Sequence, residues 1–397
     1  MLTPATETEA AALIREHAAS KTPLHIRGGG TRVGFGNAVA ADAILSSSAL
    51  TGITEYNPAE MVMTARAGTP VAEIEAALAA NGQSMAFEPM DHRGAMGTSG
   101  TPTIGGLFAV NSSGPRRFTA GAARDHLLGL RFVNGAGDVV KAGGKVMKNV
   151  TGLDLVKLLA GSHGTLGFLT EVTFKVLSVP KTAATIVVSG LEDEQAMKAL
   201  AAALSLSVEV SGAAHLPESV RARFIGGKLP DGAATVMRIE GLEASVAVRA
   251  EKLTAAMDGI GPVSRLDADD TQALWAEIRD VMPYADGTTR PLWRVSMAPS
   301  EAWKLVAGLR LRAGIDAYYD WQGGLVWMRM EADAEAEVLR HGIRTLGGGH
   351  ATLVRAAPQI RAEVAAFEPQ VPAVALLSAR IRAKLDPHGI FNPGLMT

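Results

Sequence analysis

The chain has 397 residues, of which 47% are hydrophobic and 20% charged, and its 38 basic residues nearly balance 40 acidic ones, for a net charge of −2. This composition is typical of a soluble globular protein of two or three domains, and the charge gives no sign of a nucleic-acid-binding surface. The chain has no Cys, which excludes disulfides, thiolate nucleophiles, cysteine-ligated zinc and an iron–sulfur cluster held by this chain alone.

The first twenty residues predict an amphipathic helix and not a signal peptide. Glu7 and Glu9 stand where a signal peptide has basic residues, and Thr6 and Glu9 have the spacing of a capping box. No apolar run reaches the ~18 residues of a membrane span. We therefore expect a cytoplasmic protein.

A predicted strand over residues 23–27 runs directly into Gly28-Gly29-Gly30-Thr31-Arg32. Consecutive glycines allow a tight turn whose N–H groups converge, and such a concavity suits an anion such as a pyrophosphate. The spacing is not G-x-G-x-x-G, because Val33 occupies the last position, and no Lys-Ser or Lys-Thr follows to make a Walker loop. The turn thus predicts a phosphate site outside two common nucleotide-binding folds, and a plain hairpin turn is the alternative.

Residues 103–129, TIGGLFAVNSSGPRRFTAGAARDHLLG, place glycines between apolar residues. Buried wall would then alternate with exposed backbone amides, an arrangement that suits a flat, polar-edged ligand with a phosphate tail. A glycine-rich surface loop is the alternative. Around this stretch we expect strands at 42–46, 60–68, 130–133, 138–140 and 171–176, a helix at 71–81, and a hairpin turn at Asn134-Gly135.

From about residue 180 the pattern alternates between strands and helices in two passes of similar length. We expect strands at 182–190, 234–241, 292–297, 317–321 and 325–330, and helices at 191–206, 243–257, 271–281, 301–312 and 332–345. This order predicts an α+β cap built around an antiparallel sheet. The expected domains are 1–179, 180–349 for the cap, and a segment 350–397 that returns to the first domain.

Four motifs occur in a fixed order: RGGGT, TIGG…NSSG…RFTAG…RDHLLGL, K-x-V-T-G-L-D-L and GSHGTLGFLTE. Together they resemble the FAD-binding domain of the vanillyl-alcohol oxidase flavoprotein family. Residues 385–396 resemble the closing segment of that family. Taken whole, the chain is similar to the FAD-binding subunits of bacterial glycolate oxidases. The resemblance implies a two-lobed FAD-binding domain of the PCMH-like type with an α+β cap.

The resemblance also implies a set of residues along the cofactor. These are Arg27, Gly28, Gly29, Gly30, Thr31, Arg32, Pro89, Thr103, Gly105, Gly106, Asn111, Ser112, Gly114, Gly121, Asp125, Gly129, Gly164, Gly167, Phe168 and Leu169. Two positions depart from the family pattern. Thr31 stands where members with covalent FAD often carry histidine, which implies non-covalent FAD, and His163 replaces a residue that is often acidic.

Oxidation of a 2-hydroxy acid such as glycolate, the activity that the resemblance implies, needs a cation for the carboxylate, a base for the hydroxyl proton and an apolar wall. Arg294 and Arg329 lie on predicted strands and could supply the cation, and His350, after three glycines, could be the base. Each residue also has a purely structural interpretation, as a paired arginine or a satisfied histidine. The scattered histidines predict no metal site.

The resemblance implies two partner chains, a sister FAD subunit and an iron–sulfur subunit, which could also associate the protein with a membrane. Because this chain has no Cys to hold a cluster, the electrons would leave through these partners. Two alternatives stay open. The chain could be a flavin-carrying assembly subunit without a substrate site, or a stand-alone FAD-dependent alcohol dehydrogenase of the same fold.

Overall fold

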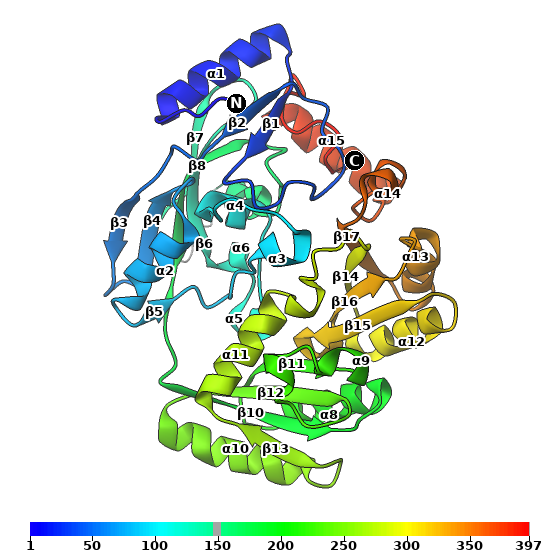
Figure 1. Cartoon of the computed structure of the whole chain (residues 1–397). Coiled ribbons are helices and arrows are strands. Elements are labelled where there is room, and N and C mark those ends of the chain that lie inside the picture. The colour runs from blue at the N-terminus through cyan, green and yellow to red at the C-terminus, as the bar shows by residue number, and fades with distance from the viewer. Residues whose placement is uncertain (146–151, 397) are drawn as a thin grey trace.

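The computed structural model describes residues 1–145 and 152–396 and shows two domains, with the amino-terminal domain above the cap in Figure 1. The amino-terminal domain contains a five-stranded antiparallel sheet of order β3-β4-β8-β6-β7 and a separate parallel pair, β1 and β2. Its elements are α1 (Glu7–Ser20), β1 (Leu24–Arg27), β2 (Ala43–Ser46), β3 (Ile53–Asn57), β4 (Val62–Arg66), α2 (Val71–Ala79), β5 (Gln83–Ser84), α3 (His92–Met96), α4 (Ile104–Ala109), α5 (Arg117–Ala120), α6 (Ala123–His126), β6 (Leu127–Val133), β7 (Val139–Gly143), α7 (Leu155–Leu159), β8 (Phe168–Lys175) and β9 (Leu177–Ser178).

Local signals in the sequence placed several of these elements correctly. Helix α1 begins where expected, because the side chain of Thr6 accepts a hydrogen bond from the Glu9 N–H group at 3.2 Å. The hairpin between β6 and β7 is also confirmed, with the Asn134 side chain accepting from the N–H groups of Ala136 and Asp138. Residues 148–151, the first part of the K-x-V-T-G-L-D-L motif, lie outside the described residues.

The glycine-rich stretch 103–129 folds into the three short helices α4, α5 and α6 and not into an open loop. Gly105 explains why a glycine is needed in α4, because a Cβ there would lie 2.6 Å from the Cβ of Ala67. The missing side chain lets α4 approach the end of β4 closely. Phe108 of the same helix packs between Phe87 and Phe174, at ring-centroid distances of 5.8 and 5.4 Å.

The cap is an eight-stranded antiparallel sheet of order β13-β10-β12-β11-β15-β16-β14-β17. Its elements are β10 (Thr182–Ser189), α8 (Asp193–Ser205), β11 (Val210–Leu216), α9 (Glu218–Arg221), η1 (Ile225–Gly227), β12 (Ala234–Gly241), α10 (Glu243–Met257), β13 (Val263–Leu266), α11 (Ala268–Arg279), η2 (Met282–Tyr284), β14 (Leu292–Met297), α12 (Pro299–Arg310), β15 (Ile315–Asp320), η3 (Trp321–Gly323), β16 (Leu325–Met330), α13 (Ala336–Thr345) and β17 (Gly349–Arg355). The prediction missed β11, whose residues Gly212, Ala213 and Ala214 give little strand signal.

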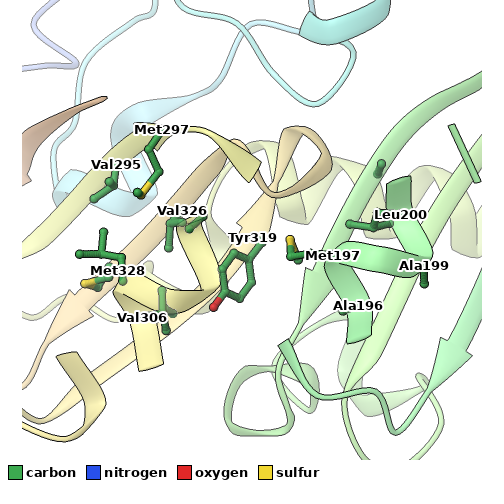
Figure 2. Close-up of a cluster of buried hydrophobic side chains, with 14 of the residues drawn as sticks. Ala196, Met197, Ala199, Leu200, Val295, Met297, Val306, Tyr319, Val326 and Met328 are labelled. Atoms are coloured by element: carbon green, nitrogen blue, oxygen red, sulfur yellow. The ribbon is translucent and has the colours of Figure 1, made fainter. Parts of the chain in front are cut away.

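The two faces of the cap sheet pack against different partners. Figure 2 shows part of the core on one face, where Tyr319 of the sheet lies beside Met197 of α8, and Val295 and Val326 of the sheet belong to the same cluster. The other face carries Leu292, Tyr318 and Trp327, which pack with side chains of α11 and with Met90 and Ala95 of the amino-terminal domain. This second face, with α11 beside it, is turned toward the amino-terminal domain (Figure 1).

The carboxyl-terminal boundary differs from the expected one. The expected break at residue 349 falls on the first residue of β17, which is the edge strand of the cap sheet, so the chain leaves the cap only after Arg355. The last residue of the run Gly347-Gly348-Gly349 already pairs with Met297 of β14. After α14 (Pro358–Glu363) and α15 (Pro372–Leu385), the chain returns to β1, where the Leu24 N–H group donates to the Ile390 carbonyl at 2.7 Å. No helix in the described ranges is both long and apolar enough to cross a membrane.

Candidate cofactor and substrate site

A cavity opens between the turn after β1, helix α4 and the start of β8. We call it the central cavity. The residues lining it are His25, Ile26, Arg27, Gly28, Gly29, Gly30, Thr31, Arg32, Val33, Phe35, Ser47, Ala67, Thr103, Gly105, Gly106, Ala109, Val110, His163, Gly164, Gly167, Phe168, Leu169, Asn392 and Leu395. Residues far apart in the sequence therefore form one site.

The glycine turn has the backbone of an anion cradle. The carbonyl groups of Gly28, Gly29, Thr31 and Arg32 all accept hydrogen bonds from protein groups. In contrast, the N–H groups of residues 28–32 donate to no group in the part of the chain that the structure describes. A ligand with phosphate oxygens would satisfy these donors.

The sequence suggests that the glycines serve a tight turn, but the structure shows a close backbone contact at position 29. A Cβ on Gly29 would lie 1.8 Å from the carbonyl oxygen of Thr101, so the missing side chain faces the segment that runs into α4. The Gly29 carbonyl in turn accepts a hydrogen bond from the Thr101 N–H group at 3.1 Å. The turn is thus held in place by backbone packing against residues 100–103.

Two arginines give the central cavity a positive charge. The Nε atoms of Arg27 and Arg32 are buried and lack a hydrogen-bond partner among the described residues. Burial lowers the pKa of Arg32 to about 10, and the carboxylate of Asp91 only partly opposes this. Orphaned guanidinium donors beside a backbone cradle fit the pyrophosphate of a dinucleotide such as FAD.

An aromatic wall borders the same cavity. The rings of Phe35 and His163 are stacked, with centroids 5.4 Å apart and planes within 6° of parallel. Burial, followed by the charge of Arg32, lowers the pKa of His163 to about 4, so the imidazole is neutral at pH 7. His163 therefore does not replace the charge of the acidic residue often found at this position in the resembled family, and it contributes a flat surface.

The predicted cofactor residues divide into two groups. The first group lines the central cavity and comes from the glycine turn, from α4 with the residue before it, and from the segment that leads into β8. Its members are Arg27, Gly28, Gly29, Gly30, Thr31, Arg32, Thr103, Gly105, Gly106, Gly164, Gly167, Phe168 and Leu169. The others, Pro89, Asn111, Ser112, Gly114, Gly121, Asp125 and Gly129, are not part of its lining. Several of these have protein partners instead. The Asn111 side chain accepts from the Arg124 N–H group, Ser112 from that of Met90, and Asp125 from that of Ala122.

Arg294 lies on the cap face that is turned toward the amino-terminal domain, in β14. Its guanidinium stacks over the ring of Trp321 at 4.9 Å and, within the described residues, forms no ion pair or side-chain hydrogen bond. Burial and then the charge of Arg117 lower the pKa of Arg294 to about 10. Arg117, from α5 of the amino-terminal domain, was not predicted as a site residue, because the adjacent pair Arg116-Arg117 carries no sequence signal of which arginine is left without a carboxylate partner.

His350 lies close to Arg294 in the sheet. It is the β17 residue opposite Ser296, so both belong to the strand face that also carries Arg294. Its imidazole is on the exposed edge of the cap, and partial burial followed by the charge of Arg294 lowers its pKa. A neutral imidazole next to a guanidinium can accept a proton.

Arg329, the third predicted catalytic residue, is engaged elsewhere. Its guanidinium forms ion pairs with Asp286 at 2.8 Å, Glu331 at 3.3 Å and Asp316 at 3.7 Å. These three carboxylates leave it no free charge for a substrate, so the structure corrects its role to a structural one.

His92 is a residue that the sequence did not mark as functional. It is buried, its ring packs edge-on against Phe35, and its Nδ1 atom lies 3.1 Å from the Met90 carbonyl. Burial, then Arg32, and more weakly Arg294, lower its pKa well below the usual value. His92 therefore lies close enough to Arg32 of the central cavity and to Arg294 of the cap for both charges to act on it.

Comparison with known proteins agrees with this geometry. Residues 1–143 match a family model described as an FAD binding domain. The chain is 32% identical to the glycolate oxidase subunit GlcE of Escherichia coli (strain K12) over 384 residues, which are 96% of this chain and 95% of that subunit. The chain belongs to the GlcE family. Its members have an FAD-binding domain of the vanillyl-alcohol oxidase type, and the protein is an FAD-linked oxidoreductase.

Two further likenesses are more limited. The glycolate oxidase subunit GlcD of Bacillus subtilis (strain 168) is 30% identical over 42% of this chain and 34% of its own length. Substrate-bound p-cresol methylhydroxylase superposes with a TM-score of 0.71 at 15% identity, over 99% of this chain and 88% of that one. This structural likeness confirms the predicted fold, a PCMH-type FAD-binding domain with an α+β cap. FAD is the cofactor that the family and the central cavity both support.

Proposed function

We propose that this chain is the FAD-binding subunit of a glycolate oxidase complex, in which a short 2-hydroxy acid such as glycolate is oxidised to the 2-oxo acid. The observation that carries the proposal is Arg294, a guanidinium without an ion-pair partner in the described residues, on the cap face turned toward the FAD-binding domain. The likeness to GlcE supports glycolate as the first substrate to test.

Each residue of the site has a chemical task in this proposal. Bound FAD supplies the ring that takes up a hydride from the substrate carbon. Arg294 holds the carboxylate through its planar fork of N–H donors. His350 accepts the hydroxyl proton, and its lowered pKa favours the neutral form that can do so. The buried Tyr318 and Trp327 provide an apolar wall on the same sheet face.

Two partner chains complete the proposed complex, a sister FAD subunit and an iron–sulfur subunit. Reduced FAD must pass its electrons onward, and a chain without Cys cannot bind an iron–sulfur cluster through thiolates of its own. The names of the relatives GlcE and GlcD, both subunits of glycolate oxidases, support an assembly of several chains.

The test is the visible spectrum of the purified, FAD-loaded chain before and after anaerobic addition of glycolate. We expect the flavin bands to bleach in the natural protein and to bleach far more slowly in Arg294→Gln. Persistent bands in the natural protein would contradict a substrate site in this chain and would favour a flavin-carrying assembly subunit. Bleaching at equal rates in both proteins would support the proposed activity but would contradict a role for Arg294 in binding the substrate.

A further inference from the structure

Two guanidinium groups, one from each domain, meet at the ring of Trp321. Arg117 comes from α5 and Arg294 from β14, and their Cζ atoms lie 4.5 and 4.9 Å from the ring centroid. In the described ranges neither side chain forms an ion pair or a hydrogen bond. Other part-buried arginines at the domain interface, Arg116 and Arg238, are paired with carboxylates. We call Arg117, Arg294 and Trp321 the arginine–tryptophan cluster.

The backbone around Trp321 is strained in a way that positions its ring. Trp321, Gln322 and Gly323 have φ values of 51°, 64° and 93°, so three consecutive residues adopt the left-handed conformation between β15 and β16. This region is unfavourable for a bulky side chain such as that of Trp321. The turn is stabilised from both domains, because the Asp320 side chain accepts from the Trp321 N–H group at 2.7 Å and the indole Nε1–H group donates to the Gly114 carbonyl at 2.9 Å.

The cluster lacks enough negative charge of its own. Burial and the charge of Arg124 lower the pKa of Arg117, while Asp125 opposes the shift. Asp320 is the carboxylate that acts on Arg294, but burial raises the pKa of Asp320 to about 7, so it is only partly ionised at neutral pH. Burial and then the charge of Arg294 lower the pKa of nearby His350, with a smaller contribution from Arg117, and Glu368 opposes the shift. An incoming anion would find two guanidinium groups poorly compensated by protein carboxylates.

We propose that Arg117 and Arg294 together bind the carboxylate group of the substrate, with Trp321 as the platform that holds both guanidinium groups. The inference rests on the proposed function and adds Arg117 to it as a residue that determines specificity for acids. Paired guanidinium groups recognise carboxylates by charge and by geometry. Because one arginine belongs to each domain, a bound acid would connect the FAD-binding domain to the cap.

The experiment is a calorimetric titration of the FAD-loaded protein with oxalate, a small dicarboxylate that has no C–H hydrogen to transfer as a hydride. We expect Arg117→Gln and Arg294→Gln each to weaken oxalate binding at least tenfold. Arg124→Gln is the matched control, since Arg124 is a neighbouring arginine with 53% of its side chain exposed, and it should bind oxalate like the natural protein. The absorbance of bound FAD confirms that each variant is loaded.

A double variant tests whether the two arginines bind the same group. If they share one carboxylate, the combined loss in Arg117→Gln/Arg294→Gln will be clearly smaller than the product of the single losses. Unchanged binding in either single variant, or losses that multiply, would overturn the shared site. Failure of the proposed function looks different. Oxalate would then bind as expected while glycolate leaves the flavin bands of the natural protein unchanged.

Discussion

The carboxylate of Glu88 in the FAD-binding domain accepts hydrogen bonds from both terminal nitrogens of Arg238 in the cap, at 2.9 and 3.1 Å. Glu88 also accepts from the backbone N–H group of Arg116 at 2.8 Å, and the Arg116 guanidinium in turn pairs with Glu240 of the cap. All these groups are largely buried. This network fixes the cap over the FAD-binding domain at the place where the arginine–tryptophan cluster forms.

We expect Glu88→Gln to lower the free energy of unfolding by about 3 kcal/mol, because the change removes one of the two carboxylates that pair with the buried Arg238 guanidinium and also a partner of Arg116. Chemical denaturation of the FAD-loaded protein would measure the loss. The control is Glu194→Gln, which removes an exposed ion pair with Lys198 within α8 and should cost about 0.5 kcal/mol or less. Equal effects in the two variants would contradict a structural role for the buried network.

The orphaned guanidinium of Arg32 predicts opposite effects on cofactor binding and on apoprotein stability. Arg32→Gln should weaken FAD binding by roughly 10- to 100-fold, as expected for loss of a charge-assisted hydrogen bond. The cofactor-free variant should be at least as stable as the natural apoprotein, because a buried unpaired charge is removed. Fluorescence titration with FAD and thermal unfolding measure the two quantities. Arg312→Gln, an exposed arginine in the cap, should change neither.

The packing of the glycine turn predicts that even a single methyl group is not tolerated at position 29. Gly29→Ala should abolish FAD retention, and Gly29→Val likewise, because either Cβ would meet the Thr101 carbonyl oxygen and displace the turn. Gly308→Ala is the control, because a Cβ there would have no other described residue within 4 Å. The ratio of FAD to protein after gel filtration is the measurement. A Gly29→Ala variant that retains stoichiometric FAD would show that the turn can shift without consequence.

The buried carboxyl of Asp320 predicts a pH dependence of stability. Burial raises its pKa to about 7 in the folded chain, so the folded state holds this proton more tightly than the unfolded state does. Its contribution to stability is therefore greatest below pH ~4, falls as the pH rises toward 7, and is constant above that. Asp320→Asn should remove this dependence while still accepting the bond from Trp321.

Thermal unfolding of both proteins between pH 4 and 8 tests this prediction. The variant should gain stability relative to the natural protein as the pH rises from ~4 to about 7, by at most ~1.4 kcal/mol for each pH unit. His163, whose lowered pKa works in the opposite direction, is present in both proteins and cancels in the difference. A difference that is constant with pH would mean that Asp320 titrates normally.

The sequence by itself determined the central cavity and most of the secondary structure. The glycine turn, α4 and the start of β8 are local motifs, and the conformational freedom of glycine or the alternation of a strand acts over a few residues. The resemblance of these motifs to the vanillyl-alcohol oxidase family predicts Arg27 through Arg32, Thr103 and Gly164 along the cofactor, and these residues all line the central cavity. The strands β12, β14 and β16 could be placed from their alternation.

Only the tertiary structure decided which arginines are available to bind a substrate. Arg329 and Arg294 look alike in sequence, each on a strand that also carries a tryptophan. Yet three carboxylates surround the first and none pairs with the second in the described chain. Arg117 and Trp321 are about two hundred residues apart and meet only because the cap folds back onto α5. Such contacts depend on long-range packing and charge pairing, for which local sequence patterns carry no signal.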